Sequence, residues 1–553
     1  MAKAVTHPSE MAGQPSRTTA KGILTEIALL LLSSLVFALS FPNFIYQWGF
    51  FPLGYFAILP AFIVIHRSGW IRIFFFGFFY GFACYALYNF WLITWHPLAI
   101  FIVPTIYAFY FLAFFPILKL IDTLFPKYGY LLQTLAWIGY EFLRTQGFLG
   151  YSYGVLGYSQ FPFLPLIRTA SLAGIWGVTL IVVFPSVILG NGLRGGIKQL
   201  LPFLSEQRVA VSVYVLLFIG LCVFGVMSES DLSASRKWKV ALIQQNIDPW
   251  RGGYPTYDKA LGILTGLSRE ALKENPEIMI WSETSFVPGI DWHTKYRTDE
   301  RSYQFVRKLK DFLENQPVAY VIGNNDGQKR TLPNGEQVRV DYNATVLYRN
   351  GQIVDIYRKL HLVQFSEHFP YRGVWTWLYD ALKNADIHWY EAGKEYVIFE
   401  DKGVRFATPI CFEDTFGDLN REFVRRGADV LVNMTNDAWS NSTVCEIQHT
   451  TMAIFRAVEN KRSIVRSTNG GITCIIDPNG RVLKQLDPFV AGYLVGEVPL
   501  LRTETTLYTL WGDWMGPLCI LVTVIGILFG AIKRVLVLEN SRPSKKLKAS
   551  KGN

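Results

Sequence analysis

Long apolar stretches alternate with short polar ones over roughly the first 230 residues, and this pattern predicts membrane-spanning helices. A helix needs about 20 mostly apolar residues to cross a bilayer. Residues 27–65 and 73–118 contain no charged residue, and each stretch is long enough for two spans. We expect breaks around residues 41–47, where Pro42-Asn43 favours a turn, and at His96-Pro97.

Four further apolar stretches complete the predicted membrane part. They lie at about residues 131–147, 171–191, 211–227 and 515–535. The first of them contains Glu141 and Arg144, which are three apart and share one helix face. Charges inside a span are often functional, as in a transporter, but we favour a structural ion pair between helices. The pattern therefore predicts eight spans, seven before a long polar region and one after it.

Lysine and arginine are concentrated in the segments that eight spans would place on one side of the membrane. They are Lys3, Arg17, Lys21, Arg67, Arg72, Lys127, Arg194, Lys198, Arg208, Lys533, Arg534, Arg542, Lys545, Lys546, Lys548 and Lys551. Positive charge is retained on the cytoplasmic side, so the polar region is expected outside the cytoplasm. The first span is not an ordinary cleaved signal peptide, because a second span follows at once.

Between the seventh and eighth spans the pattern changes to that of an α/β domain. Short apolar runs typical of buried strands occur at residues 240–244, 278–281, 320–323, 406–410 and 430–434, and residues 353–358 are also predicted to form a strand. Helical stretches lie at residues 257–273, 301–314 and 447–460. Asn350-Gly351 and Asn479-Gly480 are hairpin signals. Both faces of such a sheet must be covered, which predicts a layered sandwich.

Composition agrees with a membrane protein and excludes a disordered chain. Of 553 residues, 51% are hydrophobic and only 17% are charged, less than in most soluble proteins. The formal net charge of +10 is compatible with nucleic-acid binding, but positive charge on the cytoplasmic side is the simpler interpretation. Six cysteines in a chain this long do not form a disulfide framework, although pairing of Cys445 with Cys474 stays open.

Three residues that can carry chemistry follow predicted strands. Glu283 follows residues 278–281, Lys359 ends residues 353–358, and Cys411 follows residues 406–410 and precedes a predicted helix. A helix N-terminus can favour a thiolate, a carboxylate can take the thiol proton, and an ammonium group can balance an oxyanion.

Each of these residues also has a structural interpretation. A lone cysteine after a strand is most often a small buried hydrophobe. Glu283 could cap a helix, and Lys359 could be a surface cation beside Arg358. Spacing alone does not bring the three together.

Seven short motifs carry a resemblance to known proteins. Five lie in the polar region: Trp281-Ser-Glu283-Thr, Tyr357-Arg-Lys359-Leu-His-Leu-Val, Pro409-Ile-Cys411-Phe-Glu413, Asn436-Asp-Ala-Trp439 and Arg456-Ala-Val-Glu459. These five resemble motifs of the nitrilase superfamily. The other two, Glu141-Phe-Leu-Arg144 and Gly157-Tyr-Ser-Gln160, lie in the membrane part and resemble its membrane-embedded family, the apolipoprotein N-acyltransferases. The resemblance divides the chain into a membrane domain (1–236), an extracytoplasmic catalytic domain (237–505) and a last span with a basic cytoplasmic tail (506–553).

The resemblance implies an αββα sandwich and a Glu-Lys-Cys triad. In it Glu283 is the general base, Lys359 the oxyanion stabiliser and Cys411 the nucleophile. Substrate-binding or supporting roles are implied for Glu367, Glu413, Phe412 and Trp250. The sequence departs from the usual family pattern at Phe412, which replaces a tyrosine, in residues 364–370 and at Ser440-Asn441.

The implied reaction is acyl transfer in two steps through a Cys411 thioester. A phospholipid is the expected acyl donor, and the α-amine of a diacylated apolipoprotein is the acceptor, at the outer face of the bacterial inner membrane. The alternative is a membrane-tethered amidase or nitrile hydrolase that passes the acyl group to water. We expect no cofactor, no metal and no nucleic-acid partner, since HExxH, CxxC and Walker motifs are missing. His361 and His368 are interpreted as local loop residues.

Overall fold

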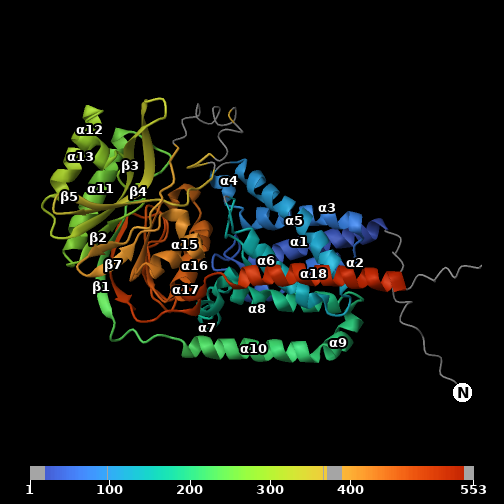
Figure 1. Ribbon diagram of the computed structural model, residues 1–553. Helices are drawn as coiled ribbons and strands as arrows, with labels where there is room; N and C mark the ends of the chain where they lie inside the picture. The colour runs from blue at the N-terminus through green and yellow to red at the C-terminus, as the bar shows by residue number, and fades with distance from the viewer. Residues whose placement is uncertain are drawn as a thin grey trace, which may run out of the picture.

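The apolar stretches form a helix bundle at one end of the molecule (Figure 1). The computed structural model describes residues 19–95, 97–147, 149–364, 366–369, 376 and 389–540. Six helices in these ranges are long and apolar enough to cross a membrane. They are α1 (Ala20–Ser40), α3 (Trp70–Tyr88), α5 (Ala99–Leu124), α8 (Ala170–Gly192), α10 (Arg208–Met227) and α18 (Met515–Asn540). The prediction of a helical membrane part is confirmed.

The other two predicted spans are helical but shorter. The second is divided into η2 (Phe51–Phe56) and α2 (Leu59–Arg67), and Pro60 lies in the first turn of α2, where a missing N–H costs nothing. The fifth is α6 (Gly129–Leu143), which has 15 residues. A short helix, α4 (Leu92–Trp95), separates α3 from α5 near the expected break. The sequence pattern did not predict helix α9 (Ile197–Glu206), which precedes α10.

The basic loops gather at the end of the bundle farthest from the polar region, where α1 begins and α18 ends (Figure 1). Arg67 donates from Nη2 to the carbonyl of Leu193 (3.2 Å). Arg194 and Lys119 pair with Asp122 at 3.1 and 3.2 Å. These contacts join the α2–α3 and α8–α9 loops to the end of α5. Lys3, Arg17, His96, Pro370 and the tail after residue 540 lie outside the described residues.

Glu141 and Arg144 do not form the expected ion pair. Both are buried, but neither a hydrogen bond nor an ion pair joins these two described side chains. Arg144 donates from Nη1 to the carbonyls of Tyr151 (2.8 Å) and Tyr153 (2.9 Å). Glu141 accepts from the indole of Trp137 (3.1 Å) and from the backbone N–H of Leu156 (3.2 Å). Each charge therefore fixes the segment after α6 separately, which is a structural role of another kind than the predicted one.

The polar region contains two six-stranded sheets. The first has the order β12-β1-β2-β3-β4-β5 and the second β11-β10-β9-β8-β7-β6. The first sheet consists of β1 (Arg236–Gln244), β2 (Ile278–Trp281), β3 (Ala319–Thr331), β4 (Gln337–Arg349), β5 (Gln352–Arg358) and β12 (Gly492–Leu500). The second consists of β6 (Phe399–Asp401), β7 (Val404–Ala407), β8 (Val430–Thr435), β9 (Ser463–Thr468), β10 (Cys474–Ile476) and β11 (Val482–Gln485). Strands β1 to β3 and β7 to β9 run parallel.

The predicted strands are found, with one difference. β7 ends at Ala407, three residues before the expected end, and Ile410 contacts Met434 of β8 only through an isolated bridge. Pro409 has no N–H for a sheet hydrogen bond, which accounts for the early end. Both hairpin predictions are confirmed: Asn350-Gly351 joins β4 to β5, and Asn479-Gly480 lies between β10 and β11.

Helices cover the outer face of each sheet and give the predicted αββα order. The first sheet packs against α11 (Tyr254–Leu272) and α13 (Glu300–Leu313). The second is covered by α15 (Gly417–Arg425) and α16 (Thr443–Asn460). Every residue of α16 from Cys445 onward is buried, because this helix also packs against α8 of the bundle. The second sheet and the membrane bundle therefore share one hydrophobic core (Figure 1).

Candidate active site

Glu283 lies just after the end of β2, where the backbone turns sharply. Thr284, the next residue, has a φ of +46°, a left-handed conformation that is uncommon for residues other than glycine. The turn lies against Gly323 of β3, and a Cβ there would come within 2.2 Å of the Ser282 carbonyl oxygen. The absence of a side chain at residue 323 therefore lets the Glu283 turn approach the sheet.

Lys359 follows β5 and is only 1% exposed. Its Nζ is 2.9 Å from the Glu367 carboxylate and 3.5 Å from Oε1 of Glu283. The Lys359 N–H donates to the carbonyl of Asn343 on β4 (2.8 Å), which fixes the start of the loop. The structure thus brings together two of the three predicted groups and adds Glu367 to them.

Cys411 begins η4 (Cys411–Thr415), which follows β7 and the Pro409 loop. Its φ is +52°, so the second turn of the site is also left-handed. Such backbone costs about 1–3 kcal/mol and persists only where its surroundings hold it. The carbonyl of Cys411 accepts from Nδ2 of Asn433 on β8 (3.0 Å). A helix of five residues is too short to favour the thiolate as the sequence led us to expect.

Burial and neighbouring charges keep the thiol protonated at rest. Burial, and then the Glu283 carboxylate, raise the pKa of Cys411 well above its usual value, and Lys359 offsets only part of this rise. Burial also raises the pKa of Glu283, against the influence of Lys359 and of hydrogen bonds with Asn343 and Cys411. Burial would lower the pKa of Lys359, but Glu367 and Glu283 raise it well above its usual value. The site thus holds a neutral thiol beside a carboxyl group and a permanent cation.

Two polar residues beside Glu283 were not predicted from the sequence. Asn343 donates from Nδ2 to Oε1 of Glu283 and to Oε1 of Glu367, at 2.8 Å each. The backbone N–H of Asn436 donates to Oε2 of Glu283 (2.9 Å). The alternation of β4 could have pointed to Asn343, because it is a buried polar residue on an inward face. The Asn436 contact depends on tertiary packing alone.

Glu413 joins the Lys359 loop to the Cys411 loop. Its carboxylate accepts from the N–H groups of Ile410 (2.7 Å), Leu360 (2.7 Å) and His361 (3.0 Å), and from the Tyr357 hydroxyl (2.9 Å). Burial raises its pKa to about 7, while these donors act in the opposite direction. The geometry gives Glu413 a supporting role, since it fixes two strand ends to one another.

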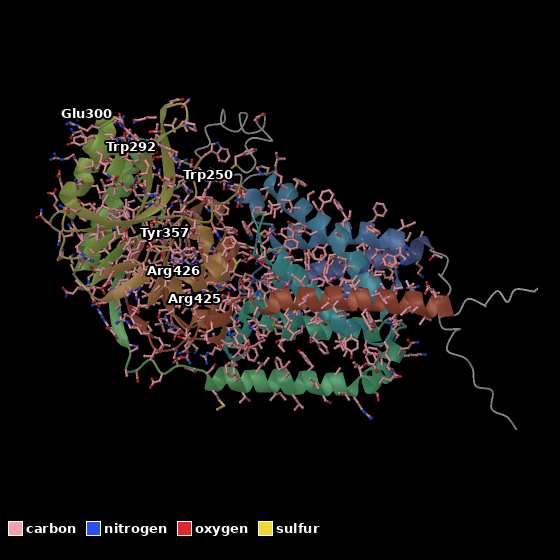
Figure 2. The ribbon with its side chains drawn as sticks, in the orientation of Figure 1. Trp250, Trp292, Glu300, Tyr357, Arg425 and Arg426 are labelled. Carbon is pink, nitrogen blue, oxygen red and sulfur yellow. The ribbon has the colours of Figure 1, made fainter. Side chains whose placement is uncertain are left out.

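The remaining predicted residues lie further from this group. Phe412 packs edge-on against Phe416 (ring centroids 5.0 Å apart), which in turn contacts the His361 ring. Trp250 lies on the loop after β1 and is 61% exposed (Figure 2). Its backbone N–H donates to Asp248, and the indole is exposed to solvent. A role for Trp250 stays a prediction.

The segments around the site are fixed to the membrane bundle. Trp439, which follows the Asn436 loop, packs against Trp91 and Trp95 with ring centroids 6.1 and 5.9 Å apart. Gln448 of α16 accepts from the indole of Trp91 (2.9 Å) and donates to the carbonyl of Pro42 (2.9 Å). The sandwich therefore meets the bundle at the edge that carries Cys411.

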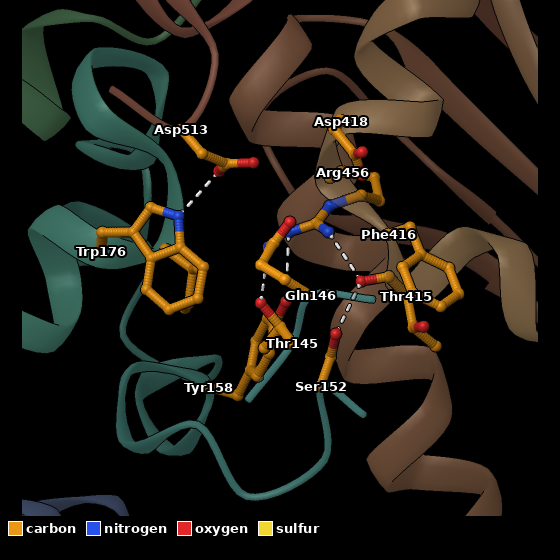
Figure 3. A pocket seen from close by; sticks show the side chains of 12 residues that line it. Thr145, Gln146, Ser152, Tyr158, Trp176, Thr415, Phe416, Asp418, Arg456 and Asp513 are labelled. Carbon is orange, nitrogen blue, oxygen red and sulfur yellow. Dashed lines mark hydrogen bonds between the residues drawn. The ribbon is translucent and has the colours of Figure 1, made fainter. Parts of the chain in front are cut away.

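A small polar cavity lies in the same junction (Figure 3). The Thr415 carbonyl accepts from Ser152 (3.1 Å) and from Arg456 (3.0 Å), and Trp176 donates to Asp513 (2.7 Å). The cavity has about 20 Å³, room for about one water molecule. It is too small to hold a lipid chain. The described residues contain no group of three or more His, Cys, Asp or Glu side chains that could hold a metal ion.

The αββα sandwich carries Glu283, Lys359 and Cys411 at its strand ends and is fixed to a membrane helix bundle. This combination defines a membrane-bound carbon-nitrogen hydrolase fold. The Carbon-nitrogen hydrolase family matches residues 239–508, and the Apolipoprotein N-acyltransferase N-terminal domain family matches residues 33–188. The chain belongs to the apolipoprotein N-acyltransferase family, as its motifs suggested.

Individual relatives are similar in sequence to this chain over nearly its whole length. Apolipoprotein N-acyltransferase 1 of Treponema denticola is 39% identical over 92% of this chain and 97% of its own length. The protein of that name from Treponema pallidum is 39% identical over 93% of this chain and 97% of its own length. Among solved structures, an amidase from Nesterenkonia sp. is 16% identical, covers 49% of this chain and 94% of its own, and has a TM-score of 0.34.

Replacing Asn343 with Leu should move the acidic limb of the reactivity profile of Cys411 to higher pH. The Asn343 amide stabilises the Glu283 carboxylate and so lowers its pKa. If Glu283 is the base, as the family resemblance implies, the variant needs a higher pH for Glu283 to accept the thiol proton, by roughly one pH unit for a hydrogen bond to a charged group. The measurement is the rate of Cys411 alkylation by iodoacetamide against pH, followed by peptide mass spectrometry.

Thr345→Val is the matched control for this change. Thr345 lies on the same strand and the same face, but its hydroxyl contacts only the sulfur of Met434. Its profile should match that of the unchanged protein. An unshifted profile in folded Asn343→Leu protein would show that Asn343 does not act on the base.

Proposed function

We propose that the protein transfers an acyl chain from a phospholipid to the α-amine of the diacylglyceryl-cysteine at the N-terminus of an apolipoprotein. The observation that carries the proposal is the meeting of Glu283, Lys359 and the Cys411 turn at the edge of the sandwich that joins the membrane bundle. The family of the chain supports it, because relatives of that name match nearly its whole length.

In the first half-reaction, Glu283 takes the proton of the Cys411 thiol, and the thiolate attacks an ester carbonyl of the phospholipid. The Lys359 ammonium stabilises the oxyanion of the tetrahedral intermediate. Its pairing with two carboxylates keeps it charged and in place. The intermediate collapses to a thioester, and the leaving alkoxide takes the proton from Glu283 and departs as a lysophospholipid.

In the second half-reaction, the α-amine of the acceptor attacks the thioester carbonyl. Lys359 again stabilises the oxyanion, and Glu283 takes a proton from the attacking nitrogen. The Cys411 thiolate leaves and receives that proton, which restores the thiol and yields an amide. Glu283 can act as the base in both half-reactions, because it gives up its proton to the leaving alkoxide at the end of the first half-reaction.

A groove between the membrane bundle and the start of α16 supports a lipid donor. It has about 640 Å³, within the range of ligand pockets, and lies between residues 43–48, Phe90 and residues 442–444. Phe44, Ile45 and Tyr46 in its wall are exposed apolar side chains. The loop that begins at Asn436, whose N–H contacts Glu283, leads directly to the Ser442 side of the groove. The groove and the Glu283 contact are thus connected by six residues of chain.

The orientation of the chain is part of the proposal. Eight crossings of the inner membrane, two of them by the shorter η2–α2 and α6 segments, place the basic loops in the cytoplasm. The catalytic domain, residues 237–505, then lies on the periplasmic side between the membrane domain (1–236) and the last span (506–553). Exposed Trp511 just before α18, and Trp95 in α4, are typical anchors at the outer interface.

A product assay separates the proposal from a hydrolase, the alternative that uses the same triad. Protein, a phospholipid and a diacylated lipopeptide with a free α-amine should give an N-acylated lipopeptide and an equal amount of lysophospholipid, detected by mass spectrometry. Cys411→Ala should abolish the product, whereas Cys222→Ala in α10 should retain it. A lipopeptide with a blocked α-amine should give none. Free fatty acid with unchanged lipopeptide would instead identify a hydrolase.

A reporter that becomes active only after export tests the orientation. It is inserted at Pro333-Asn334, in the exposed turn between β3 and β4. We expect activity, because this turn belongs to the periplasmic domain. The same reporter placed between Gly195 and Gly196, in the α8–α9 loop, should stay inactive. A reversed pattern would contradict the eight-crossing arrangement.

A further inference from the structure

Four charged side chains are buried together beneath the Cys411 turn. His449 of α16 contacts Oδ1 of Asp437 through Nδ1 (3.0 Å) and Oδ1 of Asp414 through Nε2 (2.8 Å). Arg466 of β9 pairs with both carboxylates, with Nη2 at 3.0 Å from Asp437. None of the four is more than 3% exposed. The proposed reaction does not use them.

The geometry fixes the protonation of His449. Both ring nitrogens lie at hydrogen-bond distance from carboxylate oxygens, which only accept, so both nitrogens must carry hydrogen. Asp414 and Asp437 raise the pKa of His449 to about 9, although burial acts against them. An imidazolium and a guanidinium then balance the two carboxylates. Burial also raises the pKa of neighbouring Glu446, whose protonated form adds no charge.

This cluster is connected to the nucleophile on two sides. Asp414 lies three residues after Cys411 in η4. Asp437 of η5 (Asp437–Ser440) accepts from the hydroxyl of Thr435 (2.9 Å). The Asp437 charge raises the pKa of the Cys411 thiol, and a hydrogen bond with Thr435 lowers it. An unbalanced negative charge at Asp437 would disfavour the thiolate, since like charges in a buried site raise the cost of ionisation.

We propose that His449 is a positioning residue that acts through its positive charge: it holds η4 and η5 together and neutralises Asp414 and Asp437, so that the Cys411 thiolate can form. This inference rests on the proposed role of Cys411 as nucleophile. The ring belongs to α16, which also carries the Gln448 contacts with the membrane bundle, and the Tyr153 ring of the membrane part lies 6.2 Å away. The other titratable groups that face the cluster are Glu446, Cys445, Cys474 and Tyr153.

The test compares the pH profile of Cys411 alkylation by iodoacetamide in the unchanged full-length protein and three variants, all in phospholipid nanodiscs. In His449→Gln the charge is lost while a polar side chain remains. We expect its profile to move to higher pH, with a rate at neutral pH that is lower by on the order of ten-fold. Adding Asp437→Asn removes the unbalanced carboxylate and should return the profile toward that of the unchanged protein. Thr451→Val, on α16 with a hydroxyl that contacts only Ile447, is the control for a buried substitution.

Two results would overturn the inference. One is an unshifted profile in folded His449→Gln protein. The other is a slower reaction that Asp437→Asn does not rescue, which is what a purely packing role predicts. If His449→Gln does not fold, the ¹⁵N chemical shifts of His449 in the unchanged protein decide the matter, because both nitrogens must be protonated at neutral pH. Failure of the proposed function is separate, since it would appear in the product assay as free fatty acid with unchanged lipopeptide, whatever the alkylation profiles show.

Discussion

A buried ammonium group between two carboxylates sets the arrangement of this site. Lys359 is almost fully enclosed, and an enclosed charge is tolerated only when partners balance it. Glu367 and Glu283 supply that balance, and Asn343 links the two carboxylates to one another. The same constraint applies to Glu413, which collects donors from two loops. The positions of the reactive groups thus follow from the need to satisfy buried charges.

The need to balance buried charges also shapes the junction between the sandwich and the membrane bundle. Arg456 of α16 pairs with Glu459 (2.7 Å), and Glu459 accepts from the N–H of Ile175 in α8 (3.1 Å). At that point α8 is kinked, with Gly174 at a φ of +64°, and a side chain there would meet the Tyr508 ring at 2.6 Å. Because such buried polar contacts depend on geometry, they hold the sandwich and the bundle in one relative position. Such a fixed position would suit the proposed reaction of the Cys411 thiol with a membrane lipid.

The sequence predicted the elements well and their contacts poorly. Hydrophobic periodicity located the parallel strands, α11, α13 and α16, and six long apolar helices, because burial imposes the same pattern wherever these elements occur. It overestimated the length of two predicted spans: η2–α2 is divided, with Pro60 in the first turn of α2, and α6 has only 15 residues. Strand ends pointed to Glu283, Lys359 and Cys411, but only the resemblance to a family brought them together. The alternation of β4 could have pointed to Asn343 as a buried polar residue, but not to its partners. The Asn436 N–H and the His449 cluster make contacts between residues distant in sequence, so local pattern could not reveal them.

The central claim is that Cys411 carries the acyl group between the two lipids, and the covalent intermediate tests it most directly. The measurement is the intact mass of the protein after incubation with phospholipid but without an amine acceptor. A gain of one acyl group is expected, removable by neutral hydroxylamine and discharged by a diacylated lipopeptide. The adduct should be missing in Cys411→Ala and should form far more slowly in Glu283→Gln. An adduct that persists in Cys411→Ala would contradict the assignment of the nucleophile.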